Sequence, residues 1–351
     1  MRSVRTAASA AIITLALAAC SATPDATTAS GGPTADTKVT VVTHDSFAVP
    51  DAVVAQFEQE TGIEVTFVAP GDAGALVNQL VLTKDAPLGD VAYGVDNTFA
   101  TRALDEDVFA DYVSSAPAAA DAAKYAIDGS TALTAIDFSD VCLNYDIAYF
   151  EGKGIAVPQS FDDLLEPEYR GLLSVTNPAT SSPGLAFLLA TIAAKGDGWQ
   201  EYWSRLSGNG LRVTASWSDT YYSDFSAPNY GGEYPLVLSY ASSPPFEVID
   251  GEPTTAALLD SCFRQVEYVG VLKGAAHPEA AKRVVDWMLS DDFQAALPEN
   301  MYVYPVSAAV EVPAEWKQYA PLAATPWSVP AADIDANREQ WIKDWTAVVT
   351  P

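Results

Sequence analysis

Short apolar strands alternate with helices in the first third of the chain, and this order constrains the fold more than any other feature. A β-branched run at residues 39–43 predicts a buried strand, and residues 53–60 predict an amphipathic helix. Further strands are expected at residues 64–68 and 89–93, with a helix between them. This βαβαβ order predicts an α/β fold with a doubly wound, mostly parallel sheet.

Two long extended stretches, residues 132–145 and 265–273, flank a second alternating set of strands and helices. This arrangement predicts two lobes joined by two crossing strands, with a natural ligand site in the cleft between them. The expected boundaries are residues 37–137 plus 268–305 for the first lobe, 138–267 for the second lobe, and 306–351 for a C-terminal helical segment that packs on the lobes.

The N-terminus has the pattern of an export signal. Residues 1–19 are basic and then apolar, which predicts a signal peptide. The small residues before Cys20 resemble a bacterial lipobox, which implies that Cys20 becomes the lipidated first residue. Residues 20–36 are rich in Ser, Thr, Ala, Gly and Pro, and we expect a flexible tether. The chain is therefore expected to be extracytoplasmic and to meet the cell membrane only through its lipid anchor.

The charge balance limits the possible partners. The chain has 46 acidic residues against 18 Lys plus Arg, which argues against nucleic acid, because basic patches supply affinity for phosphates. A negative field can concentrate cationic ligands, although solubility alone also explains such a charge.

Cysteine and histidine usage argues for a disulfide and against a metal site. In an exported protein, Cys142 and Cys262 are expected to pair. The two histidines, His44 and His277, are far apart, so zinc-ligand spacing is absent. The sequence also lacks Gly-x-Gly-x-x-Gly and Walker motifs, and no cofactor is expected.

The first strand stops at polar side chains, His44, Asp45 and Ser46. In open α/β sheets, ligands bind outside the carboxyl ends of the strands, so this segment is a candidate pocket wall. The alternative is that Asp45 or Ser46 only caps the next helix.

Six short motifs occur in one order between Val39 and Trp345. They are His44-Asp45-Ser46-Phe47, Gly94-Val95-Asp96-Asn97, Thr180-Ser181-Ser182-Pro183-Gly184, Trp217-Ser218, Leu236-Val237-Leu238-Ser239-Tyr240-Ala241-Ser242-Ser243-Pro244 and Tyr302-Val303-Tyr304-Pro305-Val306. With them the chain resembles the thiamine-binding proteins of ABC importers, which are type II solute-binding proteins. The resemblance implies the two-lobed type II periplasmic-binding-protein fold, with a mostly parallel sheet flanked by helices in each lobe and two crossing strands as the hinge. It also implies a monomer that captures thiamine, or its phosphates, and delivers it to an ABC transporter permease.

The resemblance also implies ligand contacts. Asp72 matches the acid that reads the aminopyrimidine, Ser181 and Ser182 match the segment at the hydroxyethyl or phosphate end, and Tyr240 matches a stacking aromatic residue. His44 stands where the family usually has Tyr, and Tyr302 where it has Trp. The full expected ligand-binding set is His44, Asp45, Asp72, Asp96, Ser181, Ser182, Trp217, Tyr240, Ser242 and Tyr302.

These residue types suit a cationic aromatic ring, because aromatic faces attract cations and a carboxylate accepts hydrogen bonds from an amino group. A helix N-terminus at Ser181 and Ser182 could receive a hydroxyl or phosphate. Each residue also has a structural interpretation: Asp72 as a turn residue, Ser181 and Ser182 as helix caps, Tyr302 as core, and His44 as a wall residue that never meets the ligand. If His44 contacts the ligand, its protonation near pH 6.5 should weaken binding of a cation.

Other functions stay open. Ferric-binding relatives need adjacent tyrosines, but Tyr240 is followed by Ala241, and the pair Tyr221-Tyr222 lies upstream. A polyamine is a further cationic candidate. A thiaminase-like enzyme needs an activated cysteine in the cleft, and the expected Cys142–Cys262 pairing leaves none, so we expect a binding protein rather than an enzyme.

Overall fold

The computed structural model describes residues 37–127, 129–228 and 230–349. The expected signal peptide, the lipidated Cys20 and the tether lie outside the described residues. No helix in the described ranges is both long and apolar enough to cross a membrane.

A mixed sheet of ten strands forms the centre of the described part, with the strand order β2-β1-β3-β11-β5-β8-β6-β7 along its main path. In its first block, β1 pairs in parallel with β2 and β3; in its second block, β6 pairs in parallel with β7 and β8. The two parallel blocks confirm the predicted α/β fold class. The strand bounds are Thr37–Val42 (β1), Ile63–Val68 (β2), Val91–Asp96 (β3), Leu173–Thr176 (β6), Arg212–Thr214 (β7) and Leu236–Tyr240 (β8).

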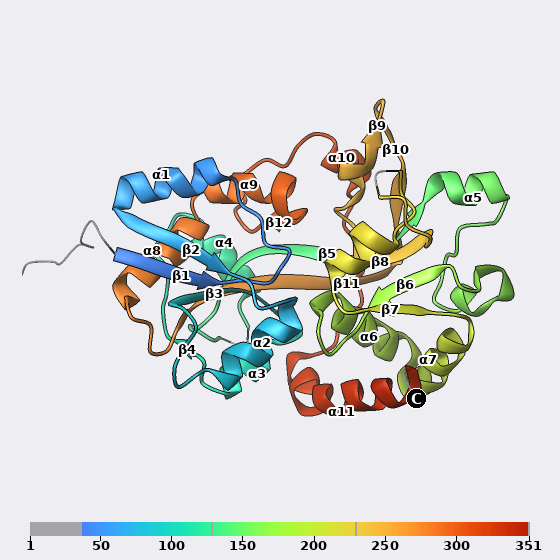
Figure 1. Ribbon diagram of the computed structural model, residues 1–351, viewed down its shortest axis with the longest axis horizontal. Helices are drawn as coiled ribbons and strands as arrows, with labels where there is room; N and C mark the ends of the chain where they lie inside the picture. The colour runs from blue at the N-terminus through green and yellow to red at the C-terminus, as the bar shows by residue number, and fades with distance from the viewer. Residues whose placement is uncertain (1–36, 128, 229, 350–351) are drawn as a thin grey trace, which may run out of the picture. The chain divides into compact units, whose positions relative to one another are not determined.

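Two long antiparallel strands, β5 (Thr134–Asp146) and β11 (Thr255–Leu272), connect the blocks (Figure 1). β11 pairs with β3 of the first block, and β5 pairs with β8 of the second. β11 begins well before residue 265, where the sequence predicted its start. The two crossing strands confirm the two-lobed fold, while the lobe boundaries at residues 137 and 267 stay predictions.

Helices cover the sheet in both lobes (Figure 1). The main ones are α1 (Asp51–Thr61), α2 (Ala73–Leu82), α3 (Ala100–Asp105), α6 (Ser182–Lys195), α7 (Trp199–Gly208), α8 (Pro278–Met288), α9 (Asp291–Met301) and α11 (Ala331–Val349). Shorter elements are β4 (Phe109–Ala110), α4 (Ala119–Ala122), α5 (Ile147–Lys153), β9 (Val248–Ile249), β10 (Glu252–Pro253), β12 (Tyr304–Pro305) and α10 (Trp316–Tyr319).

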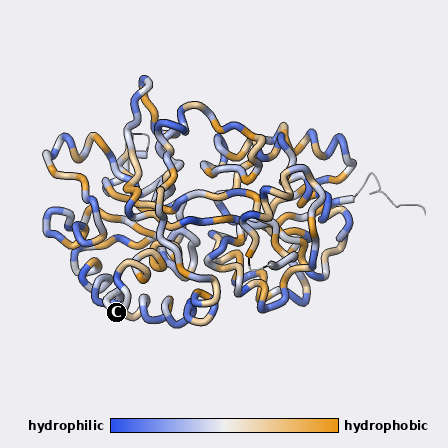
Figure 2. Tube along the Cα trace, turned by 180° about the vertical axis from the view of Figure 1, so that it is seen from behind, coloured by the Kyte–Doolittle hydropathy of each residue, from blue (hydrophilic) through white to orange (hydrophobic). Residues whose placement is uncertain are grey.

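The C-terminal helix α11 packs on both lobes, against α7 of the second and α3 of the first, where Arg338 donates to the Thr101 hydroxyl. Its tube is mostly hydrophilic (Figure 2), and its buried residues are Ile334, Arg338 and Trp345. The Trp345 ring meets the ring of Trp203 in α7 edge to face, with centroids 5.5 Å apart. Trp345 is therefore a packing residue.

The alternative interpretation, that Asp45 or Ser46 caps the helix after the first strand, is wrong. α1 begins at Asp51, and the residue before it, Pro50, makes no side-chain cap. Asp45 and Ser46 lie too early in the chain to cap it. Ser46 Oγ instead lies 2.9 Å from His44 Nδ1, so this side chain orients the imidazole.

A disulfide joins the two crossing strands. Cys142 of β5 and Cys262 of β11 are bonded, with their Cα atoms 4.3 Å apart and both side chains fully buried. The bond fastens the strands on the second-lobe side of the hinge, as the sequence predicted.

Candidate ligand-binding site

A cavity of about 30 Å³ lies where the two lobes meet. We call it the interlobe cavity. Its wall is made of His44, Ser46, Trp217, Tyr222, Tyr240, Glu267, Asn300, Met301, Tyr302 and Val303. His44 follows β1 and Tyr240 ends β8, so the cavity sits at the carboxyl ends of strands from both lobes, as open α/β sheets favour. Glu267 faces it from within β11. Its volume equals that of about one water molecule, so the lobes are closed on each other.

The backbone of Gly94 fixes the position of His44. Gly94 has φ +96°, in the left-handed region, and a Cβ there would collide with the imidazole carbon Cδ2. The Nδ1 atom faces Ser46 Oγ, and the buried Nε2 atom lies 3.4 Å from Glu267 Oε1 without a hydrogen-bond partner. Burial lowers the pKa of His44 from its ordinary value, against the opposing pull of the Asp72 and Asp45 carboxylates. His44 therefore charges below the expected pH of about 6.5.

Asp72 connects the two lobes. Its Oδ1 atom accepts a hydrogen bond from Ala73 N at 2.6 Å and caps α2, while Oδ2 accepts one from Trp217 N at 2.9 Å in the second lobe. Burial raises the pKa of Asp72 to about 6, partly offset by the Trp217 N–H and the Ser181 hydroxyl. Both carboxylate oxygens of Asp72 are thus hydrogen-bonded behind the cavity wall, one as the cap of α2 and the other as a bridge to the second lobe.

The start of α2 also meets the loop before α6. The backbone N–H groups of Gly74 and Ala75 donate to the Thr180 carbonyl oxygen, at 3.0 and 3.3 Å. A Cβ on Gly74 would lie 2.7 Å from the Thr180 carbonyl carbon. Only glycine allows these two segments to approach this closely.

Ser181, Ser182 and Asp96 are buried deeper than the cavity wall. Ser181 precedes α6 without a side-chain cap, and Ser182 is its first residue. The Thr98 hydroxyl donates to the Asp96 carboxyl group, and its Oγ1 atom lies 2.9 Å from each of the two Asp96 oxygens. Burial raises the pKa of Asp96 to about 7, while the Thr98 and Ser182 hydroxyls act in the opposite direction. These groups form a polar floor between α6 and β3.

Aromatic rings line the cavity, with Trp217 and Tyr240 from the second lobe and Tyr302 from the first. The Trp217 ring stacks on Tyr221 at 5.0 Å, and its Nε1 atom donates to Ser239 Oγ at 3.0 Å. Tyr240 lies tilted toward Trp217, with ring centroids 6.2 Å apart. Tyr302 has φ +56°, and its carbonyl oxygen accepts the hydroxyl of Ser242. Trp217, Tyr240 and Tyr302 therefore reach the cavity, and Ser242 lies behind it as support.

Three connected groups at the hinge were not predicted from the sequence: Tyr93, Asp137 and Glu267. The Tyr93 hydroxyl lies 2.5 Å from Asp137 Oδ2 and 3.2 Å from Glu267 Oε2. Burial raises the pKa of Glu267 to about 7 and that of Asp137 well above its usual range. The signal that could have indicated Asp137 and Glu267 was an acidic residue inside each of the two long extended, mostly apolar stretches. Tyr222 and Asn300, also in the wall, carried no such signal.

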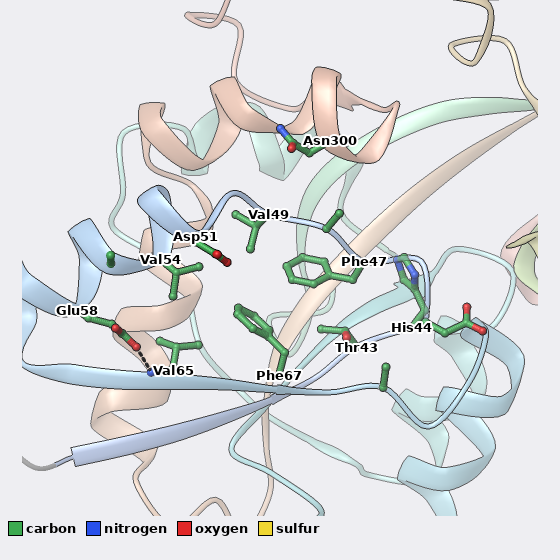
Figure 3. Close-up of a pocket in the computed structure, with 14 residues that line it drawn as sticks. Thr43, His44, Phe47, Val49, Asp51, Val54, Glu58, Val65, Phe67 and Asn300 are labelled. Carbon is green, nitrogen blue, oxygen red and sulfur yellow. Dashed lines mark hydrogen bonds between the residues drawn. The ribbon is translucent and has the colours of Figure 1, made fainter. Parts of the chain in front are cut away.

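A second pocket, of about 540 Å³, lies on the first lobe between α1, β2, the segment after β1 and Asn300 of α9 (Figure 3). Phe47 and Phe67 are neighbours in its wall, with tilted rings whose centroids lie 5.0 Å apart. The exposed Asp45 borders this pocket rather than the interlobe cavity, while His44 borders both. Within the described ranges, no group of three or more His, Cys, Asp or Glu side chains could hold a metal ion.

Comparisons with known proteins agree with this fold. The model of the family described as bacterial extracellular solute-binding protein matches residues 86–328. The chain is 30% identical over 324 residues to the thiamine-binding periplasmic protein of Escherichia coli, covering 89% of this chain and 93% of that protein. It is 27% identical to the protein of the same name from Brucella melitensis, covering 89% and 92%.

A solved structure of a periplasmic thiamin binding protein is 28% identical, with a TM-score of 0.78 over 90% of this chain and 96% of that one. The family match spans more than half of the chain, and the relatives align over nearly all of it. The chain belongs to the bacterial extracellular solute-binding protein family.

Proposed function

We propose that this protein captures thiamine in the cleft between its lobes and delivers it to the permease of an ABC importer. The observation that carries the proposal is the makeup of the interlobe cavity. Aromatic side chains and a carboxylate surround it, and its lining residues include no Lys or Arg. An aromatic cation gains from such faces by cation–π attraction, about 0.5–2 kcal/mol for each ring. The names of the E. coli and Brucella relatives support the same ligand.

Ligand entry requires the lobes to open. Pockets for small organic ligands usually measure roughly 300–1,000 Å³, far more than the closed cavity provides. The hydrogen bonds from Trp217 N to Asp72 and from Gly74 N to the Thr180 oxygen would break on opening and form again around the ligand. In this proposal His44, Trp217, Tyr240 and Tyr302 contact thiamine, while Asp72, Asp96, Ser181, Ser182 and Ser242 shape the cleft and become accessible as it opens.

The charges favour thiamine over its phosphates. Ser181 and Ser182, at the proposed hydroxyethyl end, lie beside the carboxyl groups of Asp72 and Asp96. A phosphate placed there would meet negative rather than positive partners. We therefore expect the unphosphorylated form to bind more tightly.

The remaining features follow from the sequence. We propose a monomer anchored at Cys20 outside the cytoplasm, and a binding role rather than catalysis. The paired state of Cys142 and Cys262 supports the last point, because neither is then a free thiolate.

Isothermal titration with thiamine tests the proposed function. We expect binding at micromolar or lower thiamine concentration, weaker binding of thiamine monophosphate, and large losses in Trp217→Ala and Tyr240→Ala. Lys38→Ala, which removes an exposed ion pair with Glu64, is the matched control and should bind normally. The proposal is wrong if thiamine produces no binding heat while spermidine or ferric citrate does.

A further inference from the structure

Glu267 is a buried carboxyl group that faces the ligand space. It lies in the middle of β11, is 5% exposed, and lines the interlobe cavity. On β5 the residue directly opposite is Asp137, and from β3 the Tyr93 hydroxyl reaches both carboxyl groups. Glu267 thus has one oxygen in a hydrogen-bond network at the hinge and the other toward His44 Nε2, 3.4 Å away.

The geometry of this network favours a carboxyl proton. The Tyr93 hydroxyl has a single hydrogen, yet its oxygen lies within hydrogen-bond distance of Asp137 Oδ2, at 2.5 Å, and of Glu267 Oε2, at 3.2 Å. Two separate hydrogen bonds, rather than one shared hydrogen, form here only when one carboxyl group is protonated and donates to the tyrosine oxygen. Two facing carboxylates in a buried site would also repel each other strongly.

No positively charged side chain among the described residues faces Glu267. The titratable groups that face it are Asp137 from β5, Tyr93 and Asp96 from β3, His44 after β1, and Tyr240 from β8. Burial lowers the pKa of His44, so the imidazole is neutral at neutral pH. Burial likewise raises the pKa of Glu267 to about 7. The closed protein without ligand therefore holds a proton where a cation would otherwise stand.

We propose that Glu267 is the carboxylate that binds the ligand cation, and that ligand binding expels the proton shared by the Tyr93–Asp137–Glu267 network. This inference rests on the proposed function, because it takes the ligand to be an organic cation. Where Glu267 is protonated, the cation takes the place of the proton and the proton passes to the solvent, so the charge of the site is unchanged. Tyr93 and Asp137 are positioning residues that hold the carboxylate toward the cavity.

Proton release is measured by titrating thiamine into the wild-type protein in phosphate and in Tris, two buffers that differ in ionisation enthalpy. At pH 7 we expect about half a proton released per thiamine, because a group with a pKa near 7 is half protonated there. At pH 9 the release should fall to nearly zero. Thiamine affinity should rise with pH up to about 7 and level off above it.

The variant Glu267→Gln keeps the shape of the side chain and removes its charge. We expect thiamine to bind about tenfold to hundredfold more weakly, with no proton released at pH 7. Asp137→Asn removes the repelling neighbour of Glu267, so we expect thiamine still to bind, with fewer protons released at pH 7 and better affinity at pH 6. The exposed Glu64→Gln is the matched control, and it should behave as the wild type does.

Two results would overturn the inference. If the wild type binds thiamine with the same heat in both buffers, no proton is released on binding. This measurement uses the wild type alone, so it does not depend on how well a variant folds. Unchanged thiamine affinity in Glu267→Gln would remove Glu267 from the binding site. Failure of the wild type to bind thiamine at all is a different result, which contradicts the proposed function itself and this inference with it.

Discussion

At the scale of the residue, the site depends on how closely the His44 ring approaches the backbone of Gly94. The ring occupies the space that a Cβ would fill, and the glycine has φ +96°. The imidazole is held against Ser46 on one side and Glu267 on the other. His44 is therefore fixed as part of the cavity wall rather than free to rotate.

Gly94→Ala should damage both stability and binding. The new methyl group would strain the left-handed backbone and push the His44 ring into the cavity. We expect the free energy of unfolding, measured in denaturant, to fall by more than about 1 kcal/mol, and thiamine affinity to fall with it. Gly152→Ala is the control, because Gly152 lies in α5 with open space around it, and its stability should be unchanged or higher. Equal stability of the two variants would contradict this account of His44.

Asp72→Asn tests the bridge between the lobes. Both carboxylate oxygens accept backbone N–H groups, from Ala73 and Trp217, and an amide can offer only one acceptor oxygen. We expect thiamine affinity in isothermal titration to fall by about 1 kcal/mol or more, because the closed form loses a contact. If the affinity is unchanged, Asp72 contributes neither to closure nor to ligand recognition.

The sequence identified part of the cavity wall and missed another part for physical reasons. His44, Trp217, Tyr240 and Tyr302 stood in motifs and do reach the cavity. Glu267 did not stand out, because one acidic residue in a strand does not reveal whether it faces solvent or the interior. Only the pairing of β11 with β5 places it opposite Asp137, and that pairing is a tertiary property.

At the scale of the element, the N-terminus of α2 is the contact that closes the cleft. Gly74→Ala should favour the open form, because its Cβ would lie 2.7 Å from the Thr180 carbonyl carbon only when the lobes are closed. We expect a melting temperature close to that of the wild type and thiamine affinity at least about tenfold lower, a cost of roughly 1.4 kcal/mol.

The control for Gly74→Ala is Gly208→Ala, at the end of α7 in open space. Its thiamine affinity should equal that of the wild type. Small-angle scattering with saturating thiamine should show a larger radius for Gly74→Ala than for this control. Identical radii and affinities would mean that α2 does not limit closure.

Most elements could be predicted because their sequences carry a clear local pattern of apolar residues. The β-branched run of β1 and the apolar run of α6 are examples. The start of β11 was missed because Asp260 and Ser261 interrupt its apolar pattern, and the strand shifts register between Leu258 and Phe263. Its length is set by pairing with β5 and by the disulfide, which a local pattern does not contain.

At the scale of the whole molecule, the buried acids should make stability depend on pH. Burial raises the pKa of Asp72 to about 6 and that of Asp96 and Glu267 to about 7, all above their values in an unfolded chain. The folded state therefore keeps protons that the unfolded chain releases between about pH 4 and 7, and stability falls as pH rises through this window. His44, with its lowered pKa, acts in the opposite direction but is a single group.

We expect the protein without ligand to melt at a higher temperature at pH 5.5 than at pH 8, measured by calorimetry at constant ionic strength. Glu267→Gln should reduce the difference, because it removes one of the buried acids. A melting temperature that rises between pH 5.5 and 8 would contradict the proposed burial of these carboxyl groups in protonated form.

The most direct test of the central claim is a crystal structure of the protein grown with thiamine. We expect thiamine between the lobes, with its rings against Trp217, Tyr240 and Tyr302 and its positive charge beside Glu267. Thiamine bound instead in the first-lobe pocket that Phe47 and Phe67 help to line, with the interlobe cavity still closed, would contradict this proposal.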